Sequence, residues 1–439
     1  MPKLEMEDAR RVPRTHPLYG KKVYIPRMAE DCARAVAAVM RSLGVEAEVV
    51  PPSDGRTLEL GAKYSTGDEC YPLKVTLGDF LQITERPGFD PRNTAFFMPT
   101  GRGPCRFGQY APYLRTVLAK LGYGEITIFQ PSCEQGYSDF GEAATLFTRG
   151  LWRAIVCGDI LLKLLLKTRP YEVQQGAADQ IHEECVETLC RVLEVSYPDD
   201  HSQMTALQEC LQRTRQRFGE LTVRFNPKKP FIGIVGEIFC RLHDFSNHEL
   251  LLRLEDAGAE LWMSDVSEWI SYTNADEFRI LKLHGRRVSL EALGAYFRTY
   301  FQQKDERALR GIFREDFRGY EEPANVQEVL DHAEPYLPAF GANGEMVLNV
   351  GRAIYFAHKG LDGVIDISPF TCMNGIVGEA IYPRVSQDHA GIPIRNFYFD
   401  GTHSDLERDI GIFLELAKSY QQRKPWPRET PSTATVVTL

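Results

Sequence analysis

The sequence lacks the features that mark membrane, secreted and nucleic-acid-binding proteins. Its longest apolar run, Leu151–Leu166, is interrupted by Arg153, Asp159 and Lys163, so no run reaches the length of a membrane span. The N-terminus has neither the basic start nor the apolar centre of a secretory signal peptide. A formal net charge of −9 argues against nucleic acid or an anionic lipid surface as the main partner. We therefore expect a cytoplasmic protein with no nucleic-acid or membrane partner.

Several catalytic and nucleotide-binding signatures are also missing. The chain has no P-loop, no actin-type phosphate loop, no HExxH motif and no Ser-His-Asp order. The glycines of 233–236 follow a strand pattern but lack the third glycine of a dinucleotide turn. Cys70, Cys105 and Cys372 lack the short paired spacing that is common in structural zinc sites. The sequence therefore predicts no nucleotide site in this chain.

Strand and helix patterns alternate along most of the 439 residues, which are too many for one typical core. Near the start, a short strand pattern at 22–26, a helical pattern at 31–43 and a second strand at 45–50 form a β-α-β unit, which favours a parallel sheet. A similar unit begins at Phe231. We expect an α/β fold with two to three flavodoxin- or Rossmann-like parallel-sheet lobes and a helical insert.

Changes in pattern suggest six segments. They are an N-terminal arm over 1–20, an α/β lobe over 21–141, a helical insert over 142–225, a second α/β lobe with a helical extension over 226–342, a C-terminal α/β segment over 343–422, and a loose tail over 423–439. The insert shows three helical patterns without a convincing strand, and the tail is rich in Pro, Thr and Ser.

Three cysteines share one local context. Cys70, Cys105 and Cys372 each lie in a loop that precedes a helical pattern, with proline or glycine nearby, and the last two follow clear strands. Unpaired N–H groups at a helix start favour a thiolate, and βα loops gather at the carboxyl edge of a parallel sheet. The repeated context predicts one shared metal site, and thiolates suit iron–sulfur clusters. Taken singly, each cysteine also fits a small buried apolar residue.

The other cysteines divide into two groups. Five lie in helical patterns and are interpreted as structural: Cys32, Cys157, Cys185, Cys190 and Cys210. Cys133 and Cys240 lie in contexts that we interpret as loops, and they remain possible neighbours of the site.

Cationic and amide side chains flank the first two cysteine loops. Lys74 follows Cys70, and Arg102, Arg106 and Gln109 surround Cys105. Such donors can bond to cluster sulfurs, offset negative charge or bind an anionic substrate. The competing interpretation is that they are ordinary helix-start or surface residues.

Another loop, after the strand at 231–235, carries Glu237, His243 and Asn247. These groups fit proton delivery. Asn247 also precedes a helical pattern, so capping and loop ordering is the favoured interpretation.

The segments that carry these residues resemble a known family. DECYPLK at 68–74, GPCRFGQY at 103–110, GEIFCRLHDFSNHELLLRLEDAGAELWMSDVSEWI at 236–270 and DISPFTCMNGIVGEAIYPRV at 366–385 resemble the acyl-CoA dehydratase activase-related family, also called CoA protein activase. It is related to the 2-hydroxyacyl-CoA dehydratase subunits and the double-cubane cluster proteins. The resemblance runs from about Lys21 to Lys418.

The resemblance implies an iron–sulfur protein of anaerobic metabolism. By matching motifs, Cys70, Cys105 and Cys372 would hold a 4Fe–4S cluster, or an 8Fe–9S double cubane shared between two subunits. It implies a homologous partner subunit, identical or different, and a separate actin/Hsp70-type ATPase activator with its own 4Fe–4S cluster. The electron received from the activator would pass to a small molecule or an acyl-CoA, as in an oxidoreductase or a dehydratase-type lyase.

Two alternatives stay open. In the first, the chain is a non-redox scaffold or assembly subunit that keeps the fold and has structural thiols. In the second, the thiols bind zinc.

Overall fold

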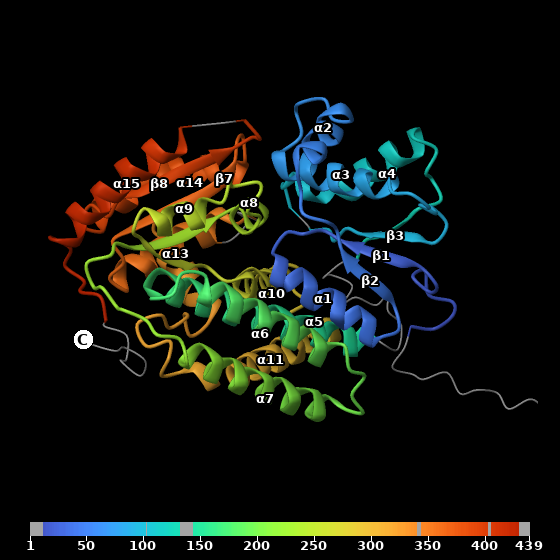
Figure 1. Ribbon diagram of the computed structural model, residues 1–439, viewed down its shortest axis with the longest axis horizontal. Helices are drawn as coiled ribbons and strands as arrows, with labels where there is room; N and C mark the ends of the chain where they lie inside the picture. Colours follow the sequence, from blue (N-terminus) through green and yellow to red (C-terminus); the bar gives the residue numbers. More distant parts are fainter. Residues whose placement is uncertain (1–11, 102, 132–143, 340–343, 403–404, 430–439) are drawn as a thin grey trace, which may run out of the picture. The chain divides into compact units, whose positions relative to one another are not determined.

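The computed structural model describes residues 12–101, 103–131, 144–339, 344–402 and 405–429. The chain forms two compact units (Figure 1). Unit 1 contains 1–158 and 186–210, and unit 2 contains 159–185 and 211–439. The boundary falls within three long helices, α5 (Ala144–Thr168), α6 (Ala177–Leu193) and α7 (Asp200–Gly219), and a short 3₁₀ turn, η4 (Arg169–Tyr171), follows α5.

In its described residues, unit 1 has a four-stranded parallel sheet in the order β2-β1-β3-β4. Its elements are β1 (Lys22–Ile25), α1 (Glu30–Ser42), β2 (Glu46–Val49), α2 (Gly55–Lys63), α3 (Tyr71–Thr84), β3 (Thr94–Phe97), the 3₁₀ helix η1 (Arg106–Gln109), α4 (Tyr110–Lys120) and β4 (Thr127–Phe129). Helices α2, α3 and α4 cover one face of this sheet and α1 the other (Figure 1). Phe80 of α3 stacks on Phe96 of β3 in the core between them.

Helix α2, which sequence patterns did not reveal, fixes the position of α3. Two glycines let the helices touch at the backbone: a Cβ on Gly61 would lie 2.1 Å from the carbonyl oxygen of Lys74, and one on Gly78 would lie 1.9 Å from that of Thr57. Buried Asp79 of α3 accepts hydrogen bonds from the hydroxyls of Ser53 and Thr57. Burial raises the pKa of Asp79 to about 7.

Unit 2 repeats the same plan in its described residues, with the parallel strand order β6-β5-β7-β8. Its elements are β5 (Phe231–Gly236), α8 (Ile238–Leu242), α9 (Leu250–Asp256), β6 (Glu260–Met263), α10 (Val266–Leu283), α11 (Leu290–Arg310), the 3₁₀ helix η5 (Gly311–Phe313), α12 (Val326–Ala333), α13 (Met346–His358), β7 (Gly363–Pro369), α14 (Met373–Asp388), β8 (Ile394–Phe399) and α15 (Leu406–Gln421). Both orders match the first four strands of a flavodoxin-like sheet.

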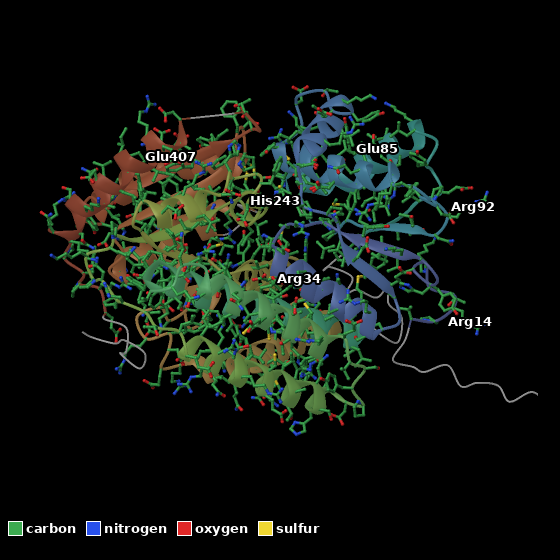
Figure 2. The ribbon with its side chains drawn as sticks, in the orientation of Figure 1. Arg14, Arg34, Glu85, Arg92, His243 and Glu407 are labelled. Atoms are coloured by element: carbon green, nitrogen blue, oxygen red, sulfur yellow. The ribbon has the colours of Figure 1, made fainter. Side chains whose placement is uncertain are left out.

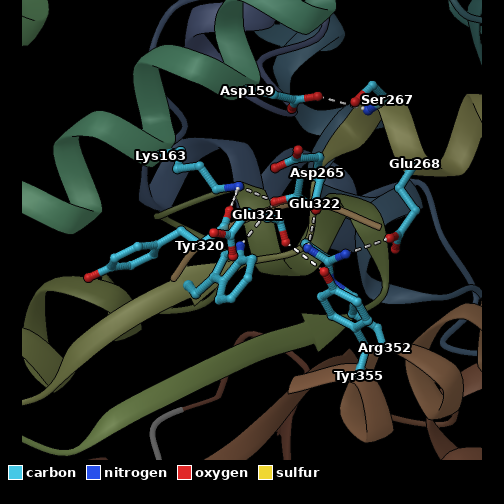
Figure 3. A network of polar contacts seen from close by, with 12 residues as sticks. Asp159, Lys163, Asp265, Ser267, Glu268, Tyr320, Glu321, Glu322, Arg352 and Tyr355 are labelled. Carbon is cyan, nitrogen blue, oxygen red and sulfur yellow. Dashed lines mark hydrogen bonds and ion pairs between the residues drawn. The ribbon is translucent and has the colours of Figure 1, made fainter. Parts of the chain in front are cut away.

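A buried network of charged groups ties the helices of unit 2 together (Figure 3). The guanidinium of Arg352, on α13, is fully buried and pairs with Glu322 and with Glu268 of α10. Lys163 of α5 and the indole N–H of Trp262 also donate to Glu322. Burial alone would raise the pKa of Glu322, but these cations hold it well below its ordinary value.

The expected α/β class with parallel-sheet lobes is confirmed. Two features of the segments differ from the expectation. The helices of 142–225 are divided between the units instead of forming an insert of their own. The strands of the expected C-terminal segment, 343–422, join the same sheet as those of 226–342.

The described part of the expected loose tail, 423–429, is anchored in unit 2. Arg428 forms two hydrogen bonds with the buried carboxylate of Glu260, at 2.6 and 2.7 Å. Its guanidinium lies 4.1 Å from the ring centroid of Phe231. Lys424 pairs with buried Asp362 at 2.7 Å.

Over the described residues, we find no helix with both the length and the apolarity that crossing a membrane requires.

Candidate functional site

Cys70 caps the start of α3, as the sequence predicted. It precedes the first helical residue, and Pro72 lies in the first turn, where a missing N–H costs nothing. The thiol is buried, and its Sγ lies 2.7 Å from the hydroxyl oxygen of Tyr110. Tyr110 is the first residue of α4. The contact therefore joins the Cys70 loop to the segment that begins at Cys105.

Cys105 is exposed and precedes η1, which runs directly into α4. The loop leading to it leaves β3 at its carboxyl end. Arg106 donates from Nη1 to the carbonyl oxygen of Asp68 at 2.6 Å, so it holds the two cysteine loops against each other. The ring of Phe107 packs edge-on against Tyr110 at 5.3 Å between centroids. Unit 1 thus brings the loops of Cys70 and Cys105 to the same edge of its sheet.

The remaining candidates of these loops are less informative. Lys74 lies in the first turn of α3 and is partly buried, whereas Gln109 ends η1 and is exposed. Arg102 and Cys133 lie outside the described residues.

Cys372 caps α14 directly after β7, which confirms the expected loop between a strand and a helix. Thr371 adopts a left-handed φ of 65°, an uncommon conformation for a branched residue. The thiol is buried. Burial and the nearby carboxylate of Glu237 raise its pKa well above the ordinary value, while the N–H groups of Asn374 and Gly375 oppose that shift.

Two carboxylates share the start of the short helix α8 beside Cys372. Glu237 accepts hydrogen bonds from the N–H groups of Phe239 and Cys240, at 3.1 and 2.8 Å. The backbone N–H of Ile238 is near enough to Glu345 to lower its pKa, which opposes the effect of burial. Burial and the charge of Glu237 raise the pKa of Glu345 to about 8, and burial also raises that of Glu237. The pair therefore retains a proton at neutral pH.

Backbone geometry brings these groups to the point where the strand order reverses. Gly236 ends β5 with a φ of 126°, and a Cβ there would lie 2.1 Å from the carbonyl oxygen of Ile367 on β7. The next N–H, of Glu237, donates to that same oxygen at 2.9 Å. In open parallel sheets, ligands bind at the carboxyl ends of the two strands that flank such a reversal.

Two amides in this region have unmatched polar atoms. Within the described part of the chain, the buried Oδ1 of Asn374 and Nδ2 of Asn349 have no hydrogen-bond partner. The other ends are used: Asn374 reaches Glu345 at 3.5 Å, and Asn349 accepts from the N–H of Gly236 at 3.2 Å. Buried polar atoms without partners are rare in folded proteins and mark places where a ligand or water completes the bonding.

The interpretation of Cys240 as a loop residue is wrong. Cys240 lies inside α8 and is fully buried, while Glu237 caps that helix. Asn247 orders the following loop, because its amide donates to the carbonyl of Cys240 and accepts from the N–H of Leu250. His243, labelled in Figure 2, ends α8 and lies 2.7 Å from the hydroxyl of Ser246.

Sequence reasoning missed several polar residues of unit 2. Glu345 immediately precedes α13, Asn349 lies within that helix, and Asn374 lies in the quoted Cys372 segment without having been singled out there. Asp366 offered a signal, since an acid in the middle of the apolar strand β7 needs buried partners. It accepts hydrogen bonds from Ser368 and Tyr382, and burial raises its pKa to about 6.

The structure therefore describes two groupings, one in each unit. Unit 1 pairs the Cys70 and Cys105 loops, and unit 2 places Cys372 with acids and amides. Among the residues that the structure describes, no three His, Cys, Asp or Glu side chains are grouped closely enough to hold a metal ion.

No protein-family model and no curated protein matches this chain.

Proposed function

We propose that this protein is the iron–sulfur-bearing component of an ATP-dependent, low-potential reductase or dehydratase system. One observation supports the proposal above all. Cys105 and Cys372 occupy the same place in two sheets of identical strand order, each capping the helix after the third strand of its sheet. Thiols placed at helix starts and at ligand-binding sheet edges suit cluster ligation.

The donor chemistry of the three thiols suits such a group. Cys70, Cys105 and Cys372 would hold a 4Fe–4S cluster, or their share of an 8Fe–9S double cubane that a second subunit completes. Two of these thiols belong to unit 1 and one to unit 2. The unpartnered amide atoms of Asn374 and Asn349 are hydrogen-bonding groups of the kind that tune a cluster from its surroundings. When bound, the cluster supplies one-electron transfer at low potential.

The chain's own acids supply protons in this proposal. Reducing or dehydrating a substrate requires proton movement at the site. Glu237 and Glu345 lie beside Cys372 and together retain a proton at neutral pH. They are therefore placed to hand a proton to a small molecule or an acyl-CoA that has accepted an electron.

The ATP-dependent step belongs to another protein in this proposal. The sequence contains no P-loop and no actin-type phosphate loop. A separate actin/Hsp70-type activator with its own cluster would deliver the electron, and a homologous subunit would pair with this chain.

Anaerobic purification tests the proposal. We expect a brown protein with iron and acid-labile sulfide, and an EPR signal after reduction. Cys105→Ala should lose most of the iron and the signal. Cys190→Ala, which changes a partly buried cysteine of the same unit on α6, should keep both.

A colourless chain with neither iron nor sulfide would contradict the proposal and favour the non-redox scaffold. Zinc without visible absorption would favour a zinc protein. An iron signal that is unchanged in Cys105→Ala would remove that residue from the site.

A further inference from the structure

Helix α11 has an exposed apolar face. Six large side chains on it are 40–87% exposed: Leu290, Leu293, Tyr296, Phe297, Tyr300 and Phe301. The opposite face packs into unit 2 through Ala292, Ala295 and Leu309. A helix that is apolar on both sides is expected to be covered on both. We call the exposed residues the α11 stripe.

The stripe has the spacing of a helix-pairing seam. Leu290, Leu293, Phe297 and Tyr300 follow the steps three, four and three, which are the a and d positions of two consecutive heptads. Tyr296 and Phe301 flank this seam. Such spacing brings all four side chains into one line along the helix.

The seam is complementary to itself when two copies run antiparallel. With the two-fold axis crossing the exposed face at the level of residue 295, Leu290 faces Tyr300 of the partner subunit and Leu293 faces Phe297 of the partner subunit. Each layer then joins one aliphatic and one aromatic side chain, and the same layers recur on the other side of the axis. A surface that matches itself in this way closes as a dimer.

The charges around the seam do not oppose this pairing. Between Leu290 and Phe301 the charged residues are Glu291 and Arg298, and both form ion pairs inside unit 2, with Arg286 and Glu277. Gly294 lies near the proposed axis, and a Cβ there would meet nothing within 4 Å. Little desolvation of charge is therefore required.

The stripe supplies most of the area that a stable dimer requires. Large apolar side chains bury on the order of 150–250 Å² each, so six that are about half exposed supply roughly 600 Å² per copy. A stable interface buries about 800 Å² per partner. Residues neighbouring the stripe, such as exposed Val288, supply part of the remainder.

We propose that the α11 stripe is the surface through which two copies of this chain form an antiparallel, two-fold dimer. This inference does not depend on the proposed redox function.

Sedimentation velocity of the full chain between about 1 and 100 µM tests the dimer. We expect a dimer in the wild type. Leu293→Glu combined with Phe297→Glu should weaken association at least about 100-fold, because two like charges per copy would be buried at the seam. Ile412→Glu combined with Leu416→Glu is the matched control: it has the same four-residue spacing on exposed positions of α15, and it should leave the dimer intact.

Both double variants change exposed residues and should retain the wild-type circular dichroism and melting temperature. The proposal is overturned if the wild type is monomeric at 100 µM, which would mean that another part of the chain or a different protein covers the stripe. It is equally overturned if the folded Leu293/Phe297 variant dimerises as tightly as the wild type.

Discussion

Units 1 and 2 use one topology for two different chemistries. In each sheet one helix leads directly into the third strand and another begins soon after it: α3 and α4 around β3 in unit 1, and α13 and α14 around β7 in unit 2. Cys70 caps the preceding helix in unit 1, and Glu345 holds the same place at the start of α13 in unit 2. The helix that follows the third strand is preceded by a cysteine in both units, Cys105 in unit 1 and Cys372 in unit 2. One unit therefore offers two thiols, and the other offers a thiol and an acid.

The likeness extends to how the preceding helix is fixed. In unit 1, α3 touches α2 at Gly61 and Gly78. In unit 2, α13 touches α12 at Gly351, where a Cβ would lie 2.0 Å from the carbonyl oxygen of Val329. Close backbone contact of this kind locks a helix along its axis, so the residue at its start is held firmly in place.

The units differ in what stabilises their interiors. Unit 2 buries a network of ion pairs around Arg352, whereas buried Asp79 of unit 1 is held by hydroxyl groups. The largest mutational effect is therefore expected in unit 2. Arg352→Met should lower the free energy of unfolding by about 3–5 kcal/mol, because it leaves Glu322 and Glu268 buried with fewer partners.

Urea unfolding followed by tryptophan fluorescence, to which Trp262 beside the network contributes, measures this loss. Arg408→Met, an exposed change on α15, should cost less than about 0.5 kcal/mol. A loss below 1 kcal/mol for Arg352→Met would show that the network does not stabilise unit 2.

The second-largest effect is expected in the rates at which the two thiols that follow the third strands are alkylated. In the cluster-free chain, iodoacetamide at pH 8 should modify exposed Cys105 at least about 100-fold faster than Cys372, because burial and a raised pKa keep the latter thiol protonated. Peptide mass spectrometry over time measures both rates in one sample. Equal rates would mean that the environments of the two thiols do not differ as described.

The raised pKa of Glu345 should have a smaller effect, which appears as a pH dependence of the free energy of unfolding. Its pKa is about 8 in the folded chain and about 4.5 when unfolded, so the folded state binds more protons between these values. The contribution of Glu345 to the free energy of unfolding should therefore fall as pH rises from 4.5 to 8. Glu345→Gln should reduce this slope by about 1 kcal/mol per pH unit.

Melting temperatures from pH 5 to 9 test this prediction, with exposed Glu415→Gln as the control that should retain the wild-type slope. The same Glu345 variant should also react faster at Cys372 at pH 8, because a nearby negative charge is removed. An unchanged slope would mean that Glu345 is ionised throughout.

The smallest effect should come from Tyr110→Phe in unit 1. It removes the hydroxyl in contact with Cys70 and should cost about 0.5–1.5 kcal/mol of stability. Exposed Tyr19→Phe should cost nothing measurable. If the two variants unfold alike, the contact between Tyr110 and Cys70 does not help to hold the loops.

Local sequence patterns predicted much of the fold. The helical pattern at 31–43 corresponds to α1 (Glu30–Ser42), within one residue at each end, and the β-α-β unit that contains it has the expected parallel pairing. Helix α2 escaped notice because Pro51, Pro52 and Gly55 read as a loop. Its stability comes from the Asp54 capping box and the backbone contact with α3, neither of which follows from apolar periodicity.

The site was predictable only in part. Cysteines beside glycine or proline ahead of helices were visible in the sequence, and all three cap helices in the structure. The matching of Cys70 with Glu345 was not visible, because it depends on two sheets sharing one strand order. Cys240 was misplaced because α8 has only five residues, too few for a helical pattern to emerge.

The claim that thiols from both units serve one cluster is tested most directly by the iron and acid-labile sulfide content of Cys372→Ala after anaerobic reconstitution. Cys185→Ala, which changes a buried cysteine of unit 2 on α6, is the control. We predict that Cys372→Ala loses most of its iron and sulfide while the control keeps them. Full iron and sulfide in Cys372→Ala would contradict the claim and restrict any metal to unit 1.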